Sequence, residues 1–575
     1  MENKNMTGYP SIDKPQYAFY KKEPTRIVNT EQTIYNLVFS KDQDMKSVAL
    51  EYLGAEWTYK KLKKETDKAA NSFYSSGLRI GDTVLIGASN CPEVVVCLLA
   101  LNKIGVVSKW FDIRAGERDI EEYANESNCK YMISFDMLIS KVSKVIDNTS
   151  LERILVITPA DSLSAIKRTG YAIKKMRSIP KDSRFIRFRD FIKNYNSKLD
   201  IECVPFDKNR PSIMVQSSGT TGKPKVIVHS DYSATSCVRS LSYSDLPISD
   251  KKILLNLLPP WIAYALGEAI IYPLSFGCKV ILSPTFEPEV IMNYIGKFTV
   301  VFTAPPPYRY LYDHFDELSS KKQKEFFDTV DTLISGGDKI SVEENKRLEQ
   351  RFKVPLVNGY GDNEGWGCLT VNPTKNNKYG SVGIPKYGET IVAYDNENGA
   401  ELPYNESGEI CALANTMFLY YEGNEKETSI VKRKHNDGNI WLHTGDLGYI
   451  DEDGYIFLKG RLRRVITRLG FKISAYTIED KISELPFIKE CVVVEVIDKI
   501  EEHVPMAFIV LNDNKQETDQ NIKEQIINKC KRELKEYEIP KHIEIVQELP
   551  YTQNGKYDFR ELEKIGNELV FEEEN

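Results

Sequence analysis

The sequence predicts an α/β protein with a large N-terminal domain of several subdomains and a small α+β C-terminal domain. Short β-branched runs alternate with helix-length apolar stretches at 78–107 and 277–302, which indicates βαβ units and parallel sheets. From about Gly380 onward, short strands separated by turn residues indicate a β-rich subdomain. After Gly460, helical and strand patterns alternate again, which indicates a separate small domain.

The same patterns give the expected elements in order. In the large domain we expect a strand at 277–284, a helix that begins after Pro288, and strands at 299–306, 332–336 and 354–358. The run Asp-Glu-Asp-Gly at 451–454 predicts a tight hairpin turn. In the small domain we expect a helix at 475–485, strands at 490–497 and 507–511, a helix at 520–536 and a strand at 542–546. We therefore divide the chain into domains 1–460 and 461–575.

Composition and charge exclude several classes of protein. The 575 residues are 41% hydrophobic and 28% charged, which is typical of a soluble globular protein and not of a disordered one. A net charge of −7 gives no reason to expect a nucleic-acid partner. The ten cysteines form no CxxC pair, so they predict reduced core residues and neither disulfides nor a zinc site. Residues 1–20 contain no apolar signal segment, so we expect a cytoplasmic location.

No segment of the sequence predicts a membrane span. The longest unbroken apolar stretch, Val94–Leu101, is far shorter than the ~20 residues that a bilayer requires. The window 253–277 contains Pro259-Pro260 and Glu268, so we interpret both stretches as buried core. A basic stretch with interleaved aromatic residues, 167–193, favours a solvated insertion between strands. Weak peripheral contact of 167–193 with a membrane surface or an anionic partner is the alternative.

A glycine-rich loop at 217–225 is the sharpest local signal, and an apolar strand precedes it. Its glycines allow backbone N–H groups to face an anion, and its hydroxyls and lysines add donors and positive charge. Only two residues separate Gly219 from the Gly-Lys pair, so it is not a Walker A loop. Taken alone, the loop fits an ordinary polar turn equally well. Its candidate phosphate-binding residues are Ser217, Ser218, Gly219, Thr220, Thr221, Gly222, Lys223 and Lys225.

Four more motifs follow this loop in order. They are NGYGDNE at 358–364, HTGDLG at 443–448, Gly460-Arg461, and QNGK at 553–556. Together with SSGTTGKPK they resemble the adenylate-forming superfamily, which includes acyl-CoA synthetases, luciferases and the adenylation domains of nonribosomal peptide synthetases. The resemblance extends from about Trp57 to Arg560, which is nearly the whole chain.

The resemblance implies an ATP site. The aromatic ring of Tyr360 would stack on adenine, and Asn358 would hydrogen-bond the adenine amino group. Asp446 would accept hydrogen bonds from the ribose hydroxyls, and Arg461 would contact the same sugar or a phosphate. The residues implied around ATP or AMP, besides the loop, are Gly336, Gly337, Asp338, Asn358, Gly359, Tyr360, Gly361, Asp446 and Arg461.

The resemblance also implies the catalytic residues. Glu364 would hold Mg²⁺, a cation that takes one or two carboxylates and phosphate oxygens. Lys556 would bridge the substrate carboxylate and the α-phosphate, and so stabilise the charge that accumulates as they react. A carboxylate is already ionised at pH 7, so no general base is required.

A second step is implied by the domain junction. In the superfamily the C-terminal domain rotates, and Arg463 stands at the hinge position where relatives usually have Asp or Lys. Gly470 would lie on the loop that approaches the pantetheine of coenzyme A. Thr467, Asn363 and Val226 depart from the usual lysine, threonine and glycine. None of these departures removes a residue expected to carry adenylation.

The acyl pocket is implied around the segment 258–267. Trp261 and Tyr264 are both eligible as its aromatic gate, and Trp366 would limit its size. Packing in the hydrophobic core explains these three aromatic residues equally well. The aspartate with which amino-acid-adenylating relatives bind an α-ammonium is absent from this segment, which favours a fatty or aryl acid.

These expectations combine into a hypothesis about function. We expect an ATP-dependent acid–thiol ligase that uses Mg²⁺, forms an acyl-AMP from a fatty or aryl acid and transfers the acyl group to coenzyme A. One alternative transfers the acyl group to the phosphopantetheine of a separate acyl carrier protein. An alternative of another class is a nucleotide-binding regulator without catalysis.

Overall fold

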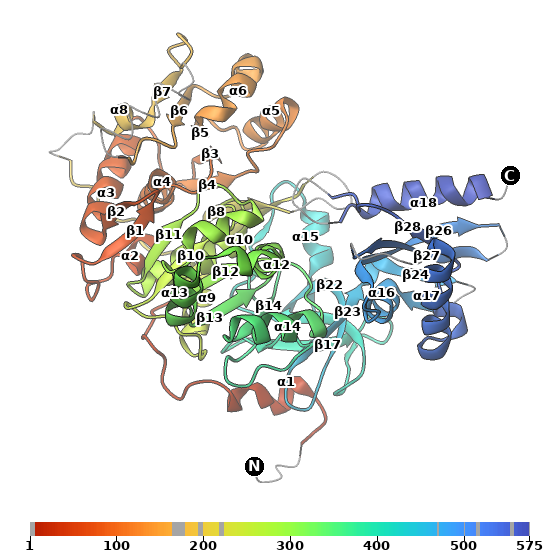
Figure 1. Ribbon diagram of the computed structural model, residues 1–575. Coiled ribbons are helices and arrows are strands. Elements are labelled where there is room, and N and C mark those ends of the chain that lie inside the picture. The colour runs from red at the N-terminus through yellow and green to blue at the C-terminus, as the bar shows by residue number, and fades with distance from the viewer. Residues whose placement is uncertain are drawn as a thin grey trace.

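The computed structural model of the chain (Figure 1) describes residues 6–163, 179–193, 199–217, 224–468, 471–499, 501–512, 518–551 and 557–573. Three sheets with packed helices build the part that precedes the predicted domain boundary, and smaller sheets build the part that follows it. Figure 1 shows this last part, drawn in blue, beside the rest of the molecule.

The first sheet has the strand order β16-β15-β14-β13-β12-β10-β11-β1-β2. Its strands are β1 (Val48–Tyr52), β2 (Ala55–Thr58), β10 (Ile253–Asn256), β11 (Lys279–Leu282), β12 (Val300–Thr303), β13 (Thr332–Ser335), β14 (Leu356–Tyr360), β15 (Thr370–Val371) and β16 (Ile384–Pro385). Neighbours from β14 to β1 pair in parallel. The carboxyl ends of β13 and β14 therefore lie side by side, with Ser335 opposite Asn358.

The second sheet has the order β20-β9-β8-β4-β3-β5-β6-β7. Its strands are β3 (Thr83–Gly87), β4 (Val107–Trp110), β5 (Tyr131–Phe135), β6 (Arg153–Ile157), β7 (Phe185–Arg187), β8 (Pro211–Gln216), β9 (Val226–Ser230) and β20 (Tyr420–Tyr421). Helix α4 (Pro92–Lys103) is buried along its whole length, and its side chains belong to a core that also contains residues of both sheets. This explains why the stretch Val94–Leu101 is apolar on every face.

The third sheet is antiparallel and has the order β18-β17-β19-β22-β21, with β23 paired to β22. Its strands are β17 (Thr390–Asp395), β18 (Ala400–Glu401), β19 (Gly408–Leu413), β21 (Lys432–Lys434), β22 (Ile440–Ile450) and β23 (Ile456–Arg461). The predicted turn at 451–454 joins β22 to β23, and the Gly454 amide donates to the Asp451 carbonyl at 2.9 Å.

The C-terminal part contains β24 (Val465–Arg468), β25 (Phe471–Ser474), α16 (Ala475–Ser483), β26 (Ile488–Asp498), β27 (Glu502–Leu511), α17 (Asp519–Glu533), β28 (His542–Ile545) and α18 (Phe559–Glu573). Strands β26, β27 and β28 form one sheet, and β24 pairs with β25. The two faces of the larger sheet carry separate cores, one with α16 and α17 and one with α18.

The remaining helices are mostly short connections. They are α1 (Pro10–Asp13), η1 (Pro15–Ala18), α2 (Ile34–Val38), α3 (Tyr59–Ser75), α5 (Glu117–Glu126), η2 (Asp136–Leu138), α6 (Ile139–Val145), η3 (Ile146–Asn148), α8 (Phe188–Lys193), α9 (Asp231–Ser242), α10 (Ala263–Leu266), η4 (Gly267–Ile271), α11 (Tyr272–Ser275), η5 (Pro288–Tyr294), α12 (Pro305–His314), η6 (Phe315–Glu317), α13 (Ser320–Thr329), α14 (Val342–Phe352), α15 (Glu425–Val431), η7 (Leu462–Arg464) and η8 (Glu536–Glu538).

The predicted fold class, a mixed α/β protein with parallel sheets and a smaller C-terminal part, is confirmed. The helix expected after Pro288 is present, as the 3₁₀ helix η5. Ile291 and Tyr294 are both buried, and at three residues per turn their side chains lie one above the other on the same face. The boundary between residues 460 and 461 stays a prediction, and β23 ends at Arg461.

The basic stretch 167–193 differs from the expected solvated insertion where the structure describes it. Residues 167–178 lie outside the described residues. In the rest, β7 forms the edge of the second sheet, and Phe185, Phe188 and Phe191 are buried in the core. These three phenylalanine side chains therefore serve packing and are not free to enter a membrane surface.

Two further predictions can be compared with the described residues. Among the helices of the described ranges, none combines the length and the hydropathy that crossing a bilayer requires. All ten cysteines lie in these ranges, none is in a disulfide, and most are buried, as predicted.

Candidate functional site

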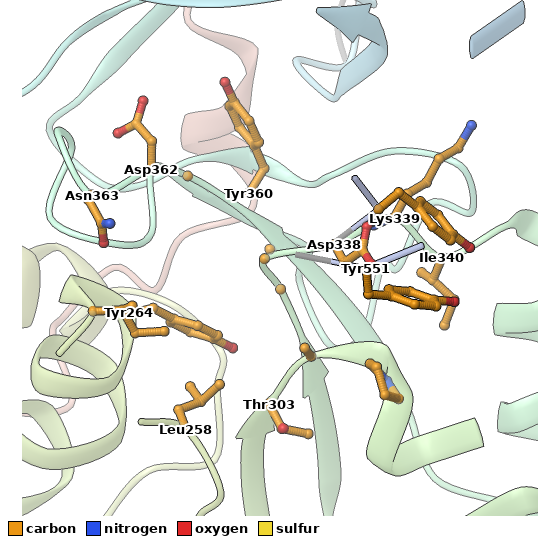
Figure 2. Close-up of a pocket in the computed structure, with 18 of the residues that line it drawn as sticks. Leu258, Tyr264, Thr303, Asp338, Lys339, Ile340, Tyr360, Asp362, Asn363 and Tyr551 are labelled. Atoms are coloured by element: carbon orange, nitrogen blue, oxygen red, sulfur yellow. Dashed lines mark hydrogen bonds between the residues drawn. The ribbon is translucent and has the colours of Figure 1, made fainter. Parts of the chain in front are cut away.

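A large cleft lies at the carboxyl ends of β12, β13 and β14 and extends to the C-terminal part of the chain. Its volume is about 3220 Å³, several times the ~300–1,000 Å³ of an ordinary small-molecule pocket. The predicted residues in its wall are Ser217, Lys225, Trp261, Tyr264, Gly336, Gly337, Asp338, Asn358, Gly359, Tyr360, Gly361, Glu364, Asp446 and Arg461. Figure 2 shows Tyr360 and Asp362 on one side of the pocket and Tyr264 and Leu258 across from them. The structure thus brings together segments that are far apart in the sequence.

The ends of the glycine-rich loop meet at one edge of the cleft. The Ser217 amide donates to the Lys225 carbonyl, and the Lys225 amide donates to Ser217 Oγ, both at 2.9 Å. The Lys225 ammonium pairs with Glu427 and lies 5.0 Å from the ring centre of Tyr421. The loop residues between these ends, Ser218, Gly219, Thr220, Thr221, Gly222 and Lys223, lie outside the described residues.

Asn363 connects three walls of the cleft. Its Nδ2 donates to the Gln216 carbonyl at the end of β8, and its Oδ1 accepts from the Ala263 amide at the start of α10. Its backbone carbonyl lies 2.7 Å from His229 Nε2 on β9. The Asn363 side chain therefore connects the end of β8 to the start of α10.

Tyr360, Asp446 and Arg461 form a polar cluster in the cleft. Tyr360 ends β14, and its hydroxyl donates to Asp446 Oδ2 at 2.6 Å. Arg461 Nε lies 3.0 Å from Asp446 Oδ1, and the carboxylate raises the pKa of Arg461. Asp446 is only 5% exposed, whereas about half of the Arg461 side chain is exposed. Asp446 is thus a buried hydrogen-bond acceptor, and Arg461 is a half-exposed cation beside it.

Glu409, which sequence reasoning did not single out, holds the part of β22 that carries Asp446. Its Oε1 accepts from the Gly445 amide at 3.0 Å, and its Oε2 accepts from His443 Nδ1 at 2.7 Å. Burial alone would raise the pKa of Glu409, but hydrogen bonds from His443 and Asn396 hold it below its usual range. Glu409 lies 37 positions before Asp446 on the neighbouring strand β19, so only strand pairing could have revealed this contact.

Two carboxylates stand where the sequence predicts a metal. Asp362 lies in the cleft close to Glu364, and burial and then the charge of Glu364 raise the pKa of Asp362 to about 8. The hydroxyl of Tyr421 donates to Glu364 Oε1 at 2.7 Å, which fixes that side chain. Adjacent carboxylates that repel each other fit a hard divalent cation such as Mg²⁺.

A second group of potential metal ligands is Cys411, His435 and His443. His443 Nδ1 faces the Glu409 carboxylate, which can only accept, so this nitrogen carries the proton. His443 Nε2 is then the acceptor for His435 Nε2, at 2.8 Å. These hydrogen bonds satisfy the rings without a metal, so we interpret the group as support for the Asp446 turn.

The predicted acyl-pocket aromatics occupy different positions. Trp261 and Tyr264 line the cleft, and Trp261 packs edge-on against Phe286 with ring centres 5.3 Å apart. Trp366 does not line it, contrary to its expected role as a pocket limiter. It is fully buried behind the wall, where its Nε1 would lie 2.8 Å from a Cβ on Gly267. The Trp366 indole therefore packs against the helix at Gly267 and supports the wall of the cleft from its buried side.

The C-terminal part closes one side of the cleft. The Lys339 ammonium pairs with Asp480 of α16 and lies 4.7 Å from the ring centre of Tyr476. Figure 2 also places Tyr551 beside Asp338 and Ile340. The predicted catalytic Lys556 and the coenzyme A residue Gly470 lie outside the described residues, as does the side chain of Arg463.

Two family models match the chain. Residues 40–422 match "AMP-binding enzyme", and residues 477–556 match "AMP-binding enzyme C-terminal domain". The chain is 26% identical over 520 residues to the long-chain-fatty-acid–CoA ligase of Bacillus subtilis (strain 168), with 88% of this chain and 90% of the relative covered. It is 28% identical over 525 residues to the mitochondrial acyl-coenzyme A synthetase ACSM3 of Mus musculus, with 88% and 84% covered.

Solved structures share the fold. The anthranilate CoA ligase AuaEII in complex with anthranoyl-AMP aligns with a TM-score of 0.80 at 20% identity, with 94% of this chain and 99% of that chain covered. The likeness extends over both the large part and the C-terminal part of the chain.

Proposed function

Because this chain belongs to the AMP-binding enzyme family, we propose that it activates a carboxylic acid with ATP and transfers the acyl group to coenzyme A, with release of pyrophosphate and AMP. The observation that carries the proposal is the assembly of three separate motifs, around Gly336, Tyr360 and Asp446, in the wall of one cleft. The names of the two curated relatives, both ligases that form coenzyme A thioesters, support the same reaction.

The nucleotide would lie between β14 and the Asp446 turn. Ribose hydroxyls donate hydrogen bonds, and the nearly buried Asp446 carboxylate is the acceptor that suits them. Arg461 would add positive charge beside the sugar or the α-phosphate. Asn358, in the middle of β14 and only 8% exposed, would face the adenine edge. Ser217 and Lys225 hold the ends of the loop that we propose to bind the phosphates.

Asp362 and Glu364 would hold Mg²⁺. When bound, the ion would neutralise charge on the phosphate oxygens and on the leaving pyrophosphate. The protein's part is to keep both carboxylates in place, which it does through the Tyr421 hydroxyl on Glu364 and the Gly365 amide on Asp362. The sequence prediction assigned the metal to Glu364 alone and did not include Asp362.

The proposed chemistry has two steps. First, a carboxylate oxygen of the acid bonds to the α-phosphorus of ATP, and the bond to the bridging oxygen of pyrophosphate breaks. Lys556 would stabilise the charge that gathers between the two anions. Second, the thiolate of coenzyme A bonds to the acyl carbon, and the bond to AMP breaks. We propose that the domain 461–575 turns about Arg463 between the steps, with Gly470 then near the thiol.

ATP–pyrophosphate exchange with a panel of carboxylic acids tests the first step. We expect acid-dependent exchange that falls by about 10²–10³-fold in Lys556→Ala, since a charge-stabilising contact is lost. Absence of exchange with every acid would contradict the proposal and favour a nucleotide-binding regulator. Formation of coenzyme A thioester tests the second step. Acylation of a carrier protein, with no coenzyme A thioester formed, would show that coenzyme A is not the acyl acceptor.

A further inference from the structure

A buried carboxylate faces the cleft from the helix that follows Trp261. Helix α10 continues through the π-helical turn η4 into α11, and Glu268 is the second residue of that turn. Its side chain is 0% exposed, yet it belongs to the wall of the cleft. A carboxylate in such a place is costly unless its oxygens find partners. π-helical turns inside α-helices are frequent at functional sites.

Within the described residues, only one carboxylate oxygen of Glu268 has hydrogen-bond partners. Oε1 accepts from the Cys368 amide at 2.8 Å and from Cys237 Sγ at 3.5 Å. Oε2 is buried and has no hydrogen-bond partner among the described residues. Burial raises the pKa of Glu268 to about 7, against the lowering effect of the nearby Lys386 ammonium. That ammonium lies 3.5 Å from Glu389, and no Lys386–Glu268 ion pair occurs in the described ranges.

The neighbour of this oxygen in the wall of the cleft is a glycine. Gly367 lines the cleft, and a Cβ at this position would lie 2.7 Å from Glu268 Oε2. A side chain there would therefore clash with the carboxylate. The hydroxyl of Tyr264, one helical turn earlier, is also buried and makes no hydrogen bond within the described part of the chain. Two polar atoms on one helical face thus point to a ligand that supplies their partners.

The direction of the pocket follows from the same contacts. The Tyr264 hydroxyl lies 3.3 Å from where a Cβ of Gly336 would stand, so this ring borders the proposed nucleotide site. Glu268 lies one turn farther along the helix, against Cys368. An acid whose carboxylate meets the α-phosphate would therefore pass Tyr264 and direct its opposite end toward Glu268.

We propose that the substrate is a carboxylic acid with a hydrogen-bond-donating group, a hydroxyl or an ammonium, at the end remote from its carboxylate, and that Glu268 binds that group. This specificity rests on the proposed function and narrows it: an unsubstituted fatty acid would bury Glu268 Oε2 without a partner. Sites built to bond a polar substrate group reject the analogue that lacks it.

A purely structural role for the carboxylate is the competing explanation, because Glu268 lies near Lys386 in a buried charged cluster. Glu389 is the matched control. It is also a buried carboxylate with a pKa raised by burial to about 7, and it pairs with the same lysine. Unlike Glu268, it is not among the described residues that line the cleft.

The test measures kcat/KM in ATP–pyrophosphate exchange for the full-length protein. Acids of matched length, from butyric to decanoic acid, are compared with their ω-hydroxy and ω-amino forms. We expect an ω-hydroxy or ω-amino acid to exceed its methyl-ended partner by about tenfold or more. Glu268→Leu should abolish this preference while exchange with methyl-ended acids persists, and Glu268→Gln should lower the ω-amino preference more than the ω-hydroxy one. Glu389→Gln should keep the wild-type ratio.

Each of the other possible results contradicts either this inference or the proposed function. Robust exchange that favours methyl-ended acids equally in wild type and Glu268→Leu overturns this inference and leaves the proposed function standing. Equal loss of preference in Glu389→Gln and Glu268→Gln also overturns it, because the cluster would then act as structure alone. Absence of exchange with every acid overturns the proposed function and the inference with it.

Discussion

Asp446 shows how one residue can order a site before its ligand arrives. Its two oxygens engage Tyr360 and Arg461, which come from different strands. The same carboxylate is the proposed acceptor for the ribose hydroxyls. A nucleotide would therefore find the tyrosine ring, the carboxylate and the guanidinium already arranged, which lowers the entropy cost of binding.

Replacement of Asp446 by asparagine should raise the KM for ATP by about 10–100-fold, because an amide is a weaker acceptor and no longer holds Arg461. Tyr360→Phe removes one hydrogen bond of 2.6 Å and keeps the ring, so its effect should stay below about tenfold. Both are measured by ATP–pyrophosphate exchange at varied ATP concentration. Equal effects would show that the carboxylate does not bind the ribose.

Glu389 gives a pH dependence of stability with a definite sign. Burial raises its pKa in the folded protein from 4.5 to about 7, despite the opposing charge of Lys386. The folded state thus binds more protons than the unfolded state between these values, and stability is lost as pH rises through the folded pKa. The contribution is fully present below about pH 4.5.

We predict that the difference in free energy of unfolding between wild type and Glu389→Gln falls by on the order of 1–3 kcal/mol from pH 4.5 to 7, since each pKa unit is about 1.4 kcal/mol. Urea unfolding midpoints at several pH values measure it, and groups common to both proteins cancel in the difference. A difference that is flat with pH would mean that folding does not shift the pKa of Glu389.

At the scale of elements, the part of β22 around Gly445 depends on its neighbour β19. The pairing of these strands shifts register between Glu409 and Cys411, and the Glu409 carboxylate reaches both the Gly445 amide and His443. Asp446 follows directly, so β19 determines where the ribose acceptor stands. Glu409 touches none of the proposed reacting atoms and is a positioning residue.

Glu409→Gln should raise the KM for ATP several-fold and leave kcat at saturating ATP within about twofold, because a misplaced acceptor weakens binding more than the chemical step. Glu409→Asp, which keeps the charge on a shorter side chain, should recover part of the loss. Steady-state kinetics of both variants measure the changes in KM and in kcat separately. A fall in kcat with unchanged KM would contradict the positioning role.

Close backbone approach makes Gly361 sensitive to substitution. A Cβ at this position would lie 1.7 Å from the Gly367 carbonyl oxygen, so Gly361→Ala must separate the two ends of the loop that carries Asp362 and Glu364. We expect loss of exchange by about 10²-fold or more with the rest of the fold retained. Gly423→Ala is the control, since its Cβ meets no atom within 4 Å and only its φ of +64° is strained. Circular dichroism and exchange assays compare the two.

The elements also show what a sequence can and cannot predict. The parallel strands, the turn at 451–454 and the C-terminal elements were predictable, because each depends on a local pattern of apolar and turn residues. The 3₁₀ type of η5 was not, since apolar residues three positions apart share a face in α-helices and in 3₁₀ helices alike. The contacts of Glu268 with Cys368 and of Glu409 with Gly445 join residues 100 and 36 positions apart, and no local pattern encodes them.

At the scale of the whole molecule, the cleft is completed by residues from both predicted domains. Arg464, Tyr476 and Tyr557 of the C-terminal part belong to its wall, and Lys339 of the large part pairs with Asp480. An exposed ion pair contributes only about 0–1 kcal/mol, so it can break and reform during a cycle. This ion pair would therefore not prevent the C-terminal part from turning as proposed.

This weak connection gives a test of the proposed rotation. Arg463 lies within the 3₁₀ turn η7 that joins β23 to β24. Proline at this position would fix φ near −65° and resist the backbone change that rotation needs. We expect Arg463→Pro to lower coenzyme A thioester formation by about tenfold or more, because only that step requires the second arrangement, while ATP–pyrophosphate exchange stays within about threefold. Arg463→Ala, which leaves the backbone free, should keep both rates near wild type. Equal loss of both steps in the proline variant would place the hinge elsewhere.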